Sequence, residues 1–204
     1  MAQARAAGAA DAYRWAVHES GIITGFRGDV ATSLERLQES HDLAAAADDR
    51  DLLYRCYVNL SSVMLNSGYP LGQPRELLER ARTMARRSAS YGTLTFVLDN
   101  YAGLSWLQGR FVDVIEQAEE ALDAAARAGF PTLEGELHRV RSEAMFALGR
   151  DEEAVADLAV AVERAAEDAQ HSDYLKVAVA RQALAENPER AVAELRGPHP
   201  EFKG

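Results

Sequence analysis

The chain of 204 residues contains a single cysteine, Cys56. One cysteine cannot close an internal disulfide, so no disulfide framework supports the fold, and a reducing compartment is expected. No stretch of about 18 apolar residues is present to span a bilayer, and the first residues lack the apolar run of a signal peptide. We therefore expect a soluble, cytoplasmic protein without a membrane partner.

Positive charge is also scarce. The 22 lysines and arginines are outnumbered by 32 aspartates and glutamates, which gives a formal net charge of −10. Binding to nucleic acid depends mainly on neutralising phosphates, so this balance argues against a nucleic-acid partner. The acidic residues are spread along the predicted helices, which favours a solvated outer surface. The acids expected on that surface include Glu116, Glu119, Glu120, Asp123, Glu152, Glu153 and Asp157.

Motifs of enzymes and of cofactor sites are missing. The sequence has no Gly-x-x-x-x-Gly-Lys-Ser/Thr phosphate loop, no Gly-x-Gly-x-x-Gly and no His-Glu-x-x-His. Cys56 lies among tyrosines and leucines, which is typical of a small buried hydrophobe rather than a nucleophile. We expect no catalytic residue, no metal and no cofactor. An enzyme would need Asp99, Arg139 and Glu143 to converge in one pocket.

The feature that is abundant is internal repetition. Turns that contain glycine fall at Gly28, Gly68, Gly109 and Gly149, with spacings of 40, 41 and 40 residues. One series of small residues falls at Gly21, Ser61, Ala102 and Ser142, and a second at Ser40, Ala81, Ala121 and Ala161. All three series have a period of 40 or 41 residues, which indicates stacked structural repeats.

Each repeat is expected to be a pair of antiparallel helices. Two helices approach closely only where the side chains between them are short, so both small-residue series should lie buried at the contacts. In contrast, Ala125 is expected near the exposed side of its helix. No alternation typical of strands appears anywhere. The predicted fold class is therefore all-α, a right-handed α-solenoid of four to five repeats with a period of about 40 residues.

The helix pairs are predicted from the apolar periodicity and the turn residues. Their ranges are 4–26 and 29–47, 49–67 and 74–89, 92–108 and 111–128, 132–148 and 151–169, and a shorter fifth pair at 172–186 and 188–196. Asp29, Asp151 and Ser172 stand where N-caps or acids of the first turn belong. We expect one domain over residues 1–196 and a disordered tail over 197–204.

Two kinds of segment resemble the tetratricopeptide repeat family. Residues 57–62 (Tyr-Val-Asn-Leu-Ser-Ser) and 98–103 (Leu-Asp-Asn-Tyr-Ala-Gly) are similar to the first helix of that repeat. Residues 107–111 and 148–154 are similar to its turn and the start of its second helix. The period is longer than the consensus of that family, and the usual proline after the second helix is missing.

Longer repeats of this kind resemble the C-terminal regions of bacterial LuxR/MalT-type ATP-dependent transcription regulators. In that family the resemblance implies a region that senses an effector or partner, while other domains hydrolyse ATP and bind DNA. The chain is then either a piece of such a protein or a stand-alone scaffold, and the sequence leaves this open.

The resemblance also implies that first helices line a concave groove that binds a protein or peptide. Arginine and aromatic side chains, which dominate binding hot spots, are prominent in the implied set. Its members are Trp15, His18, Phe26, Arg55, Asn66, Phe96, Asp99, Trp106, Glu136, Arg139, Glu143 and Phe146. The alternatives that stay open are that the aromatics pack between repeats, that the groove closes over a small-molecule effector, that copies of the chain associate, or that the chain is an enzyme using Asp99, Arg139 and Glu143.

Overall fold

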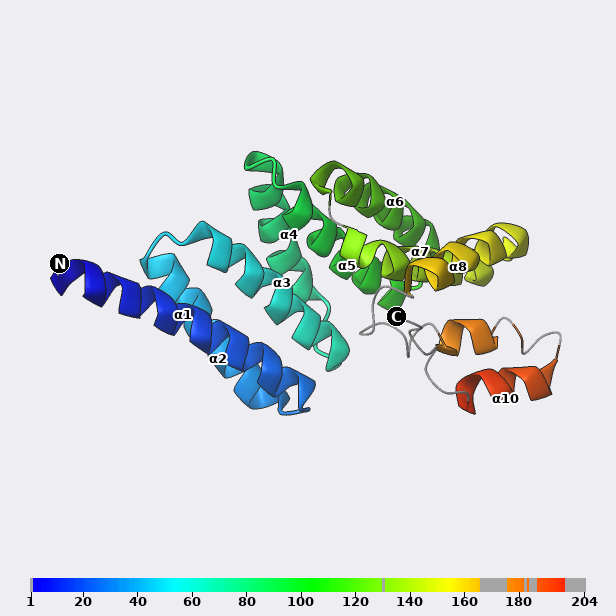
Figure 1. Cartoon of the computed structure of the whole chain (residues 1–204), viewed down its shortest axis with the longest axis horizontal. Helices are drawn as coiled ribbons and strands as arrows, with labels where there is room; N and C mark the ends of the chain where they lie inside the picture. Colours follow the sequence, from blue (N-terminus) through cyan, green and yellow to red (C-terminus); the bar gives the residue numbers. More distant parts are fainter. Residues whose placement is uncertain (1, 130, 166–175, 182, 184–186, 197–204) are drawn as a thin grey trace. The chain divides into compact units, whose positions relative to one another are not determined.

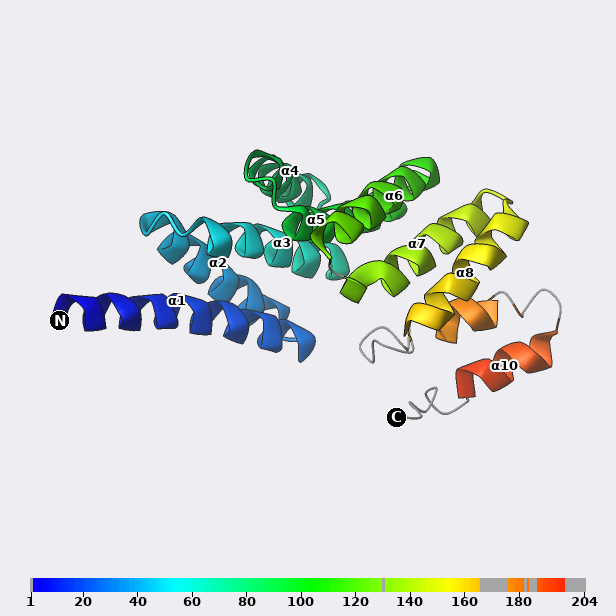
Figure 2. The same cartoon turned by 45° about the horizontal axis from the view of Figure 1, so that its top comes forward.

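The computed structural model describes residues 2–129, 131–165, 176–181, 183 and 187–196, and over these residues the protein is all-helical, without a strand. Consecutive helices lie side by side in pairs (Figures 1 and 2). The helices are α1 (Ala2–Phe26), α2 (Val30–Ala46), α3 (Arg50–Asn66), α4 (Gly72–Arg87), α5 (Tyr91–Leu107), α6 (Phe111–Ala128), α7 (Glu134–Ala147), α8 (Asp151–Ala165) and α10 (Pro188–Arg196).

The predicted helix boundaries agree closely with the described ones. A short 3-10 helix, Pro131–Leu133, precedes α7 at a point where the sequence predicted the α-helix itself. In the fifth pair, residues 176–181 and 183 are helical and α10 follows. Ser172, the end of the predicted helix 151–169 and the tail 197–204 lie outside the described residues.

Helix ends follow local capping chemistry. The Asp29 carboxylate accepts a hydrogen bond from the Thr32 backbone N–H at 3.1 Å and caps α2, as predicted. Asp49 caps α3 in the same way through Leu52, at 3.1 Å. Each such cap satisfies a backbone donor that has no partner inside the helix. The turns after α1, α3, α5 and α7 place glycines at positive φ, namely Gly28, Gly68, Gly109 and Gly149.

Small residues lie at the helix contacts, as predicted. A Cβ added to Gly21 in α1 would come within 2.9 Å of the Leu37 Cγ in α2, so only glycine fits there without movement. The Ser33 hydroxyl of α2 donates to the Gly21 carbonyl at 2.8 Å. The other members of the two series are fully buried: Ser40, Ser61, Ala81, Ala102, Ala121, Ser142 and Ala161. The prediction for Ala125 was wrong, since its side chain is also fully buried.

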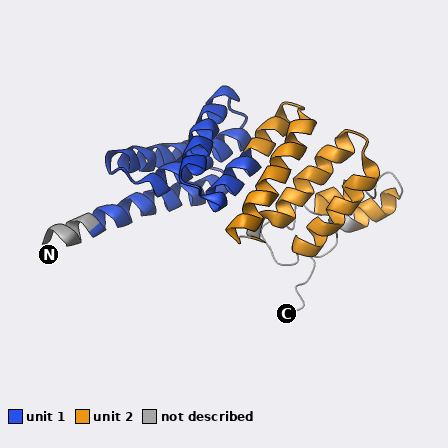
Figure 3. Cartoon of the chain, turned by 90° about the horizontal axis from the view of Figure 1, so that it is seen from above, with its two compact units in different colours: residues 1–100 blue, residues 101–204 orange. Residues whose placement is uncertain are grey.

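The chain divides into two compact units, residues 1–100 (unit 1) and 101–204 (unit 2), and the boundary falls inside α5 (Figure 3). Unit 1 has a core cluster of Ala44, Leu52 and Cys56. Burial raises the pKa of the Cys56 thiol to about 11, which keeps it protonated and unreactive at neutral pH. Among the described helices, none is long and apolar enough to cross a membrane.

Unit 2 contains an apolar cluster that draws on α5, α6, α7 and α8. Its buried members are Ala102, Val114, Ile115, Ala144, Met145 and Ala154. Alanines make up half of this set, so the helices approach closely, and the larger residues fill the space at the edges. Trp106 and Phe146 are among the partly buried side chains that pack against it.

Candidate functional site

The first helices of unit 1, α1 and α3, bring a tryptophan and an arginine together. The Arg55 guanidinium carbon lies 5.3 Å from the centroid of the Trp15 ring and 5.8 Å from that of Tyr54. Both distances are within the range for a cation–π contact. Trp15 is half-buried and also packs against the unit 1 core cluster, whereas Arg55 is exposed. We call Trp15, Arg55 and Tyr54 the unit 1 face.

Arg55 keeps its hydrogen-bond donors available. Its side chain makes no hydrogen bond or ion pair with any residue that the structure describes. A cation–π contact does not engage the N–H groups of a guanidinium with an oxygen acceptor, so the contact with Trp15 holds Arg55 in place and leaves its donors available. The unit 1 face therefore presents an oriented cation next to aromatic surface.

His18 lies next to this face but is fully buried. Its Nε2 is 3.1 Å from the Asn59 amide nitrogen, which also donates to the Arg55 carbonyl at 3.0 Å. Because that nitrogen can only donate, Nε2 accepts, and the proton is assigned to Nδ1, which lies 3.1 Å from the Glu19 carboxylate. His18 thus ties α1 to α3 and presents no side-chain atom to a partner.

The two remaining predicted residues of α1 and α3 lie at the ends of these helices. Phe26 has an exposed fraction of 77%, the largest among the exposed large apolar side chains of the described residues. Asn66, the last residue of α3, is exposed and its amide lies 3.5 Å from the Ser62 hydroxyl. Both are accessible to a partner.

In unit 2, α7 carries three predicted residues that contact one another. Arg139 donates twice to Glu136, at 2.8 and 2.5 Å, and once to Glu143, at 2.5 Å. The three side chains are only 12–18% exposed. Burial would lower the pKa of the Arg139 guanidinium, but the two carboxylates outweigh it and raise the pKa. The donors of Arg139 are thus already engaged within its own helix.

The other predicted aromatic and acidic residues are half-buried. Trp106 meets Phe111 edge to face, with 5.1 Å between ring centroids, and packs against the unit 2 cluster. Phe146 packs against that cluster and a second one around Leu158. Phe96 and Asp99 are half-buried in α5. Packing against these apolar clusters accounts for part of the buried surface of Trp106 and Phe146.

A buried charged cluster joins α7 to α8, and it was not predicted. The Asp157 carboxylate accepts from Arg141 Nε at 2.7 Å, from Arg141 Nη2 at 2.6 Å and from His138 Nδ1 at 2.6 Å. Its exposed fraction is 6%, so its assignment to the solvated surface was wrong. Burial would raise the pKa of Asp157, but the hydrogen bonds from Arg141 and His138 hold it below its usual range.

The spacing of α8 contained a signal for this cluster. Asp157 follows Ala154 by three residues and precedes Ala161 by four, and both alanines are fully buried. Residues with these spacings share one side of a helix, which for Ala154 and Ala161 is the inner side. An acid in that register needs a buried partner, and Arg141 and His138 provide it.

Within the ranges that the structure describes, no three His, Cys, Asp or Glu side chains gather in a way that could hold a metal ion. No family model matches the chain, and no curated protein matches it.

Proposed function

We propose that the chain is a non-enzymatic scaffold that binds a protein or peptide through its first helices. In this proposal the helix pairs are repeats of about 40 residues in a right-handed α-solenoid. Two observations support the repeat. The four glycines at positive φ recur every 40 or 41 residues, and the fully buried small residues recur with the same spacing.

The observation that carries the binding proposal is the cation–π contact between Arg55 and Trp15. Tryptophan and arginine are enriched in the hot spots of protein interfaces. Holding the guanidinium on the indole ring before binding reduces the conformational entropy that is lost on binding. Since the described residues leave its donors without an acceptor, Arg55 can donate to carbonyl or carboxylate oxygens of a partner chain.

Phe26 provides a second anchor. A large apolar side chain that is 77% exposed gains free energy when a partner covers it. The unit 1 face and Phe26 are therefore favoured over the α7 residues as the binding determinants, because Arg139 is already held by two glutamates. The resemblance to bacterial regulators extends the proposal to a sensor or assembly module within such a protein.

The test uses the tagged full chain to capture partners from an extract of the source organism, followed by measurement of affinity for the captured partner. Arg55→Ala should weaken binding about 30-fold, which corresponds to roughly 2 kcal/mol for a hot-spot residue. Phe26→Ala should also lower the affinity for the captured partner. Neither change should shift the thermal melt by more than a degree or two, since both side chains are exposed.

Arg80→Ala is the matched control, because Arg80 is an exposed arginine of unit 1 on a second helix. It should leave the affinity unchanged. If Arg55→Ala and Phe26→Ala both bind every captured partner as tightly as the unaltered chain, neither the unit 1 face nor Phe26 belongs to the binding surface.

A further inference from the structure

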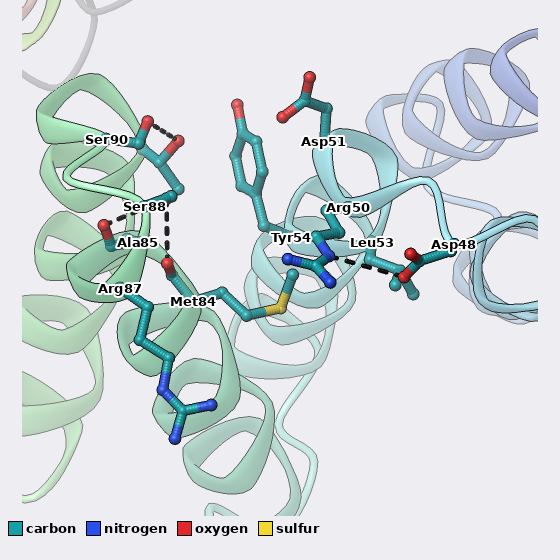
Figure 4. A pocket seen from close by; sticks show the side chains of 11 residues that line it. Asp48, Arg50, Asp51, Leu53, Tyr54, Met84, Ala85, Arg87, Ser88 and Ser90 are labelled. Atoms are coloured by element: carbon teal, nitrogen blue, oxygen red, sulfur yellow. Dashed lines mark hydrogen bonds and ion pairs between the residues drawn. The ribbon is translucent and has the colours of Figure 1, made fainter.

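Unit 1 also contains a pocket of about 460 Å³ that lies between the beginning of α3, the end of α4 and the beginning of α5 (Figure 4). Ligand pockets in proteins have volumes of roughly 300–1,000 Å³, so the size suits a short peptide segment. The apolar part of the lining comes from Leu53, Tyr54 and Met84. The Met84 thioether and the Tyr54 ring can both contact an apolar or aromatic side chain.

Hydroxyl groups form one wall of the pocket, and their hydrogen bonds are made within the chain. The Ser88 hydroxyl donates to the Met84 carbonyl at 3.0 Å, and the hydroxyls of Ser90 and Thr93 are 2.6 Å apart. These bonds fix the end of α4 and the start of α5. The wall is therefore formed before any ligand arrives.

The charges of the rim are not equivalent. Arg50 lies 3.5 Å from Asp48, so these two charges compensate each other. Asp51 and Arg87 make no hydrogen bond or ion pair with any residue in the described part of the chain. In the view of Figure 4 they lie at opposite ends of the pocket, with Tyr54 and Met84 between them. The pocket thus has an acidic end, an apolar middle and a basic end.

We propose that this pocket binds a linear peptide segment in which one large apolar side chain lies between an acidic and a basic residue. The apolar side chain packs on Met84 and Tyr54, the acidic residue pairs with Arg87 and the basic residue pairs with Asp51. The charges of such a peptide are opposite to those of Asp51 and Arg87. Each of these two side chains, which have no partner among the described residues, would then be paired. The pocket shares Tyr54 with the unit 1 face, but the proposal does not rest on the proposed function.

The test measures binding of labelled peptides to the full chain by fluorescence anisotropy. Two probes, Gly-Gly-Glu-Phe-Lys-Gly-Gly and Gly-Gly-Lys-Phe-Glu-Gly-Gly, differ only in the order of the charges. A third probe has alanine in place of phenylalanine. One charge order should bind at least about 5-fold more tightly than the other, and the alanine probe should bind at least about 10-fold more weakly than the better one. Absence of saturable binding at millimolar protein overturns the proposal.

Exchanging the charges of Asp51 and Arg87 tests directly whether these two residues set the preferred charge order of the peptide. In Asp51→Lys/Arg87→Glu the acidic and basic ends change places, so the preferred charge order should reverse. The matched control is Glu76→Lys/Arg80→Glu, two exposed residues of α4 outside the pocket, which should keep the original preference. A preference that the rim exchange leaves unchanged overturns the proposal.

Arg55→Ala separates this pocket from the unit 1 face. It should leave peptide affinity within about 2-fold, because Arg55 contacts Tyr54 but does not itself line the pocket. If Arg55→Ala removes peptide binding instead, the peptide lies on the unit 1 face, which overturns the pocket proposal and agrees with the proposed function. Loss of partner capture by Arg55→Ala with unchanged peptide binding agrees with both.

Discussion

In unit 1, serine hydroxyls join α2 to α1, whereas in unit 2 a buried ion pair joins α8 to α7. Ser33 and Ser40 of α2 are fully buried and donate to the carbonyls of Gly21 and Arg14, at 2.8 and 3.1 Å. In unit 2, Asp157 accepts from Arg141 and His138 at the corresponding contact. Both contacts satisfy buried polar groups, but the contact in unit 2 buries an ion pair, whereas the charged group at the α1–α2 contact is the half-buried Arg36, which donates to the hydroxyls of Ser20 and Thr24.

This difference has a consequence for stability. A neutral hydrogen bond contributes about 1 kcal/mol net, and removing its hydroxyl leaves a carbonyl that the helix itself already engages. Removing one partner of a buried ion pair is different, because it leaves the other charge desolvated and unpaired. The α7–α8 contact is therefore expected to be much more sensitive to substitution than the α1–α2 contact.

The largest effect is expected for Asp157→Ala. Breaking a buried ion pair typically costs about 3–5 kcal/mol, whereas Ser33→Ala in unit 1 should cost about 1 kcal/mol. The free energy of unfolding from urea titrations, with hydrogen exchange to locate the loss, measures both. Glu152→Ala, an exposed acid of the same helix, is the control and should stay within 0.5 kcal/mol, or about the noise of surface substitutions. Equal losses for Asp157→Ala and Ser33→Ala would contradict the comparison.

Lowering the pH should remove the contribution of the Asp157 carboxylate to stability in the unaltered chain, without a substitution. The pKa of Asp157 is lower in the folded chain than in the unfolded chain, so the ionised carboxylate favours folding. This stabilisation is complete above the ordinary pKa of aspartate, about 3.9, and is lost as the pH falls through the lower folded pKa.

The stability of the unaltered chain and of Asp157→Asn should therefore differ near neutral pH and converge as the pH falls below about 4. Urea titrations at a series of pH values measure this. A constant difference over the whole range would mean that the carboxylate charge is not what holds α8 on α7.

Close packing is the feature that the two units share. Ala102 in unit 2 and Ser61 in unit 1 are both fully buried at helix contacts. Replacing either one with leucine should cost about 1–3 kcal/mol, because the added volume forces the helices apart. Ala126→Leu, at an exposed position of α6, should cost well under about 1 kcal/mol. Thermal melts compare the three, and a Ser61→Leu variant as stable as Ala126→Leu would show that the packing of unit 1 is looser.

The sequence predicted the features that recur. Helix ranges, turn glycines and buried small residues follow from short-range geometry repeated along the chain, so a period is enough to locate them. Ala125 was misplaced although it follows the fully buried Ala121 by four residues, a spacing that puts both on the same side of α6. Asp157 was misplaced because its charge was given more weight than its position three residues after Ala154.

The candidate site was less predictable. The resemblance implied positions on the first helices, but it did not distinguish Arg55, which keeps its donors available, from Arg139, which two glutamates hold. Glu136 and Glu143 lie three and four residues from Arg139, a spacing that favours ion pairs on one helix. The pocket at the start of α3 combines segments about 40 residues apart, so no local pattern indicates it.

The smallest change in the free energy of unfolding is expected for substitutions in the turns after α2, α4 and α6, the second helices of their pairs. Unit 1 places Asp48 and Ala89 at positive φ, 52° and 51°, whereas unit 2 has Gly129 at 62° after α6. A Cβ in this left-handed region costs roughly 1–2 kcal/mol, and aspartate tolerates it better than alanine does. Ala89→Gly should therefore stabilise the chain by about 0.5–1 kcal/mol after the entropic cost of glycine is subtracted.

The reciprocal change, Gly129→Ala, should destabilise it by a similar amount of about 1 kcal/mol, because it introduces in unit 2 the strain that Ala89 carries in unit 1. Asp48→Gly should lie closer to zero than Ala89→Gly. Paired thermal and urea melts of the three variants resolve these differences. A destabilised Ala89→Gly would mean that the Ala89 side chain makes contacts worth more than its backbone strain.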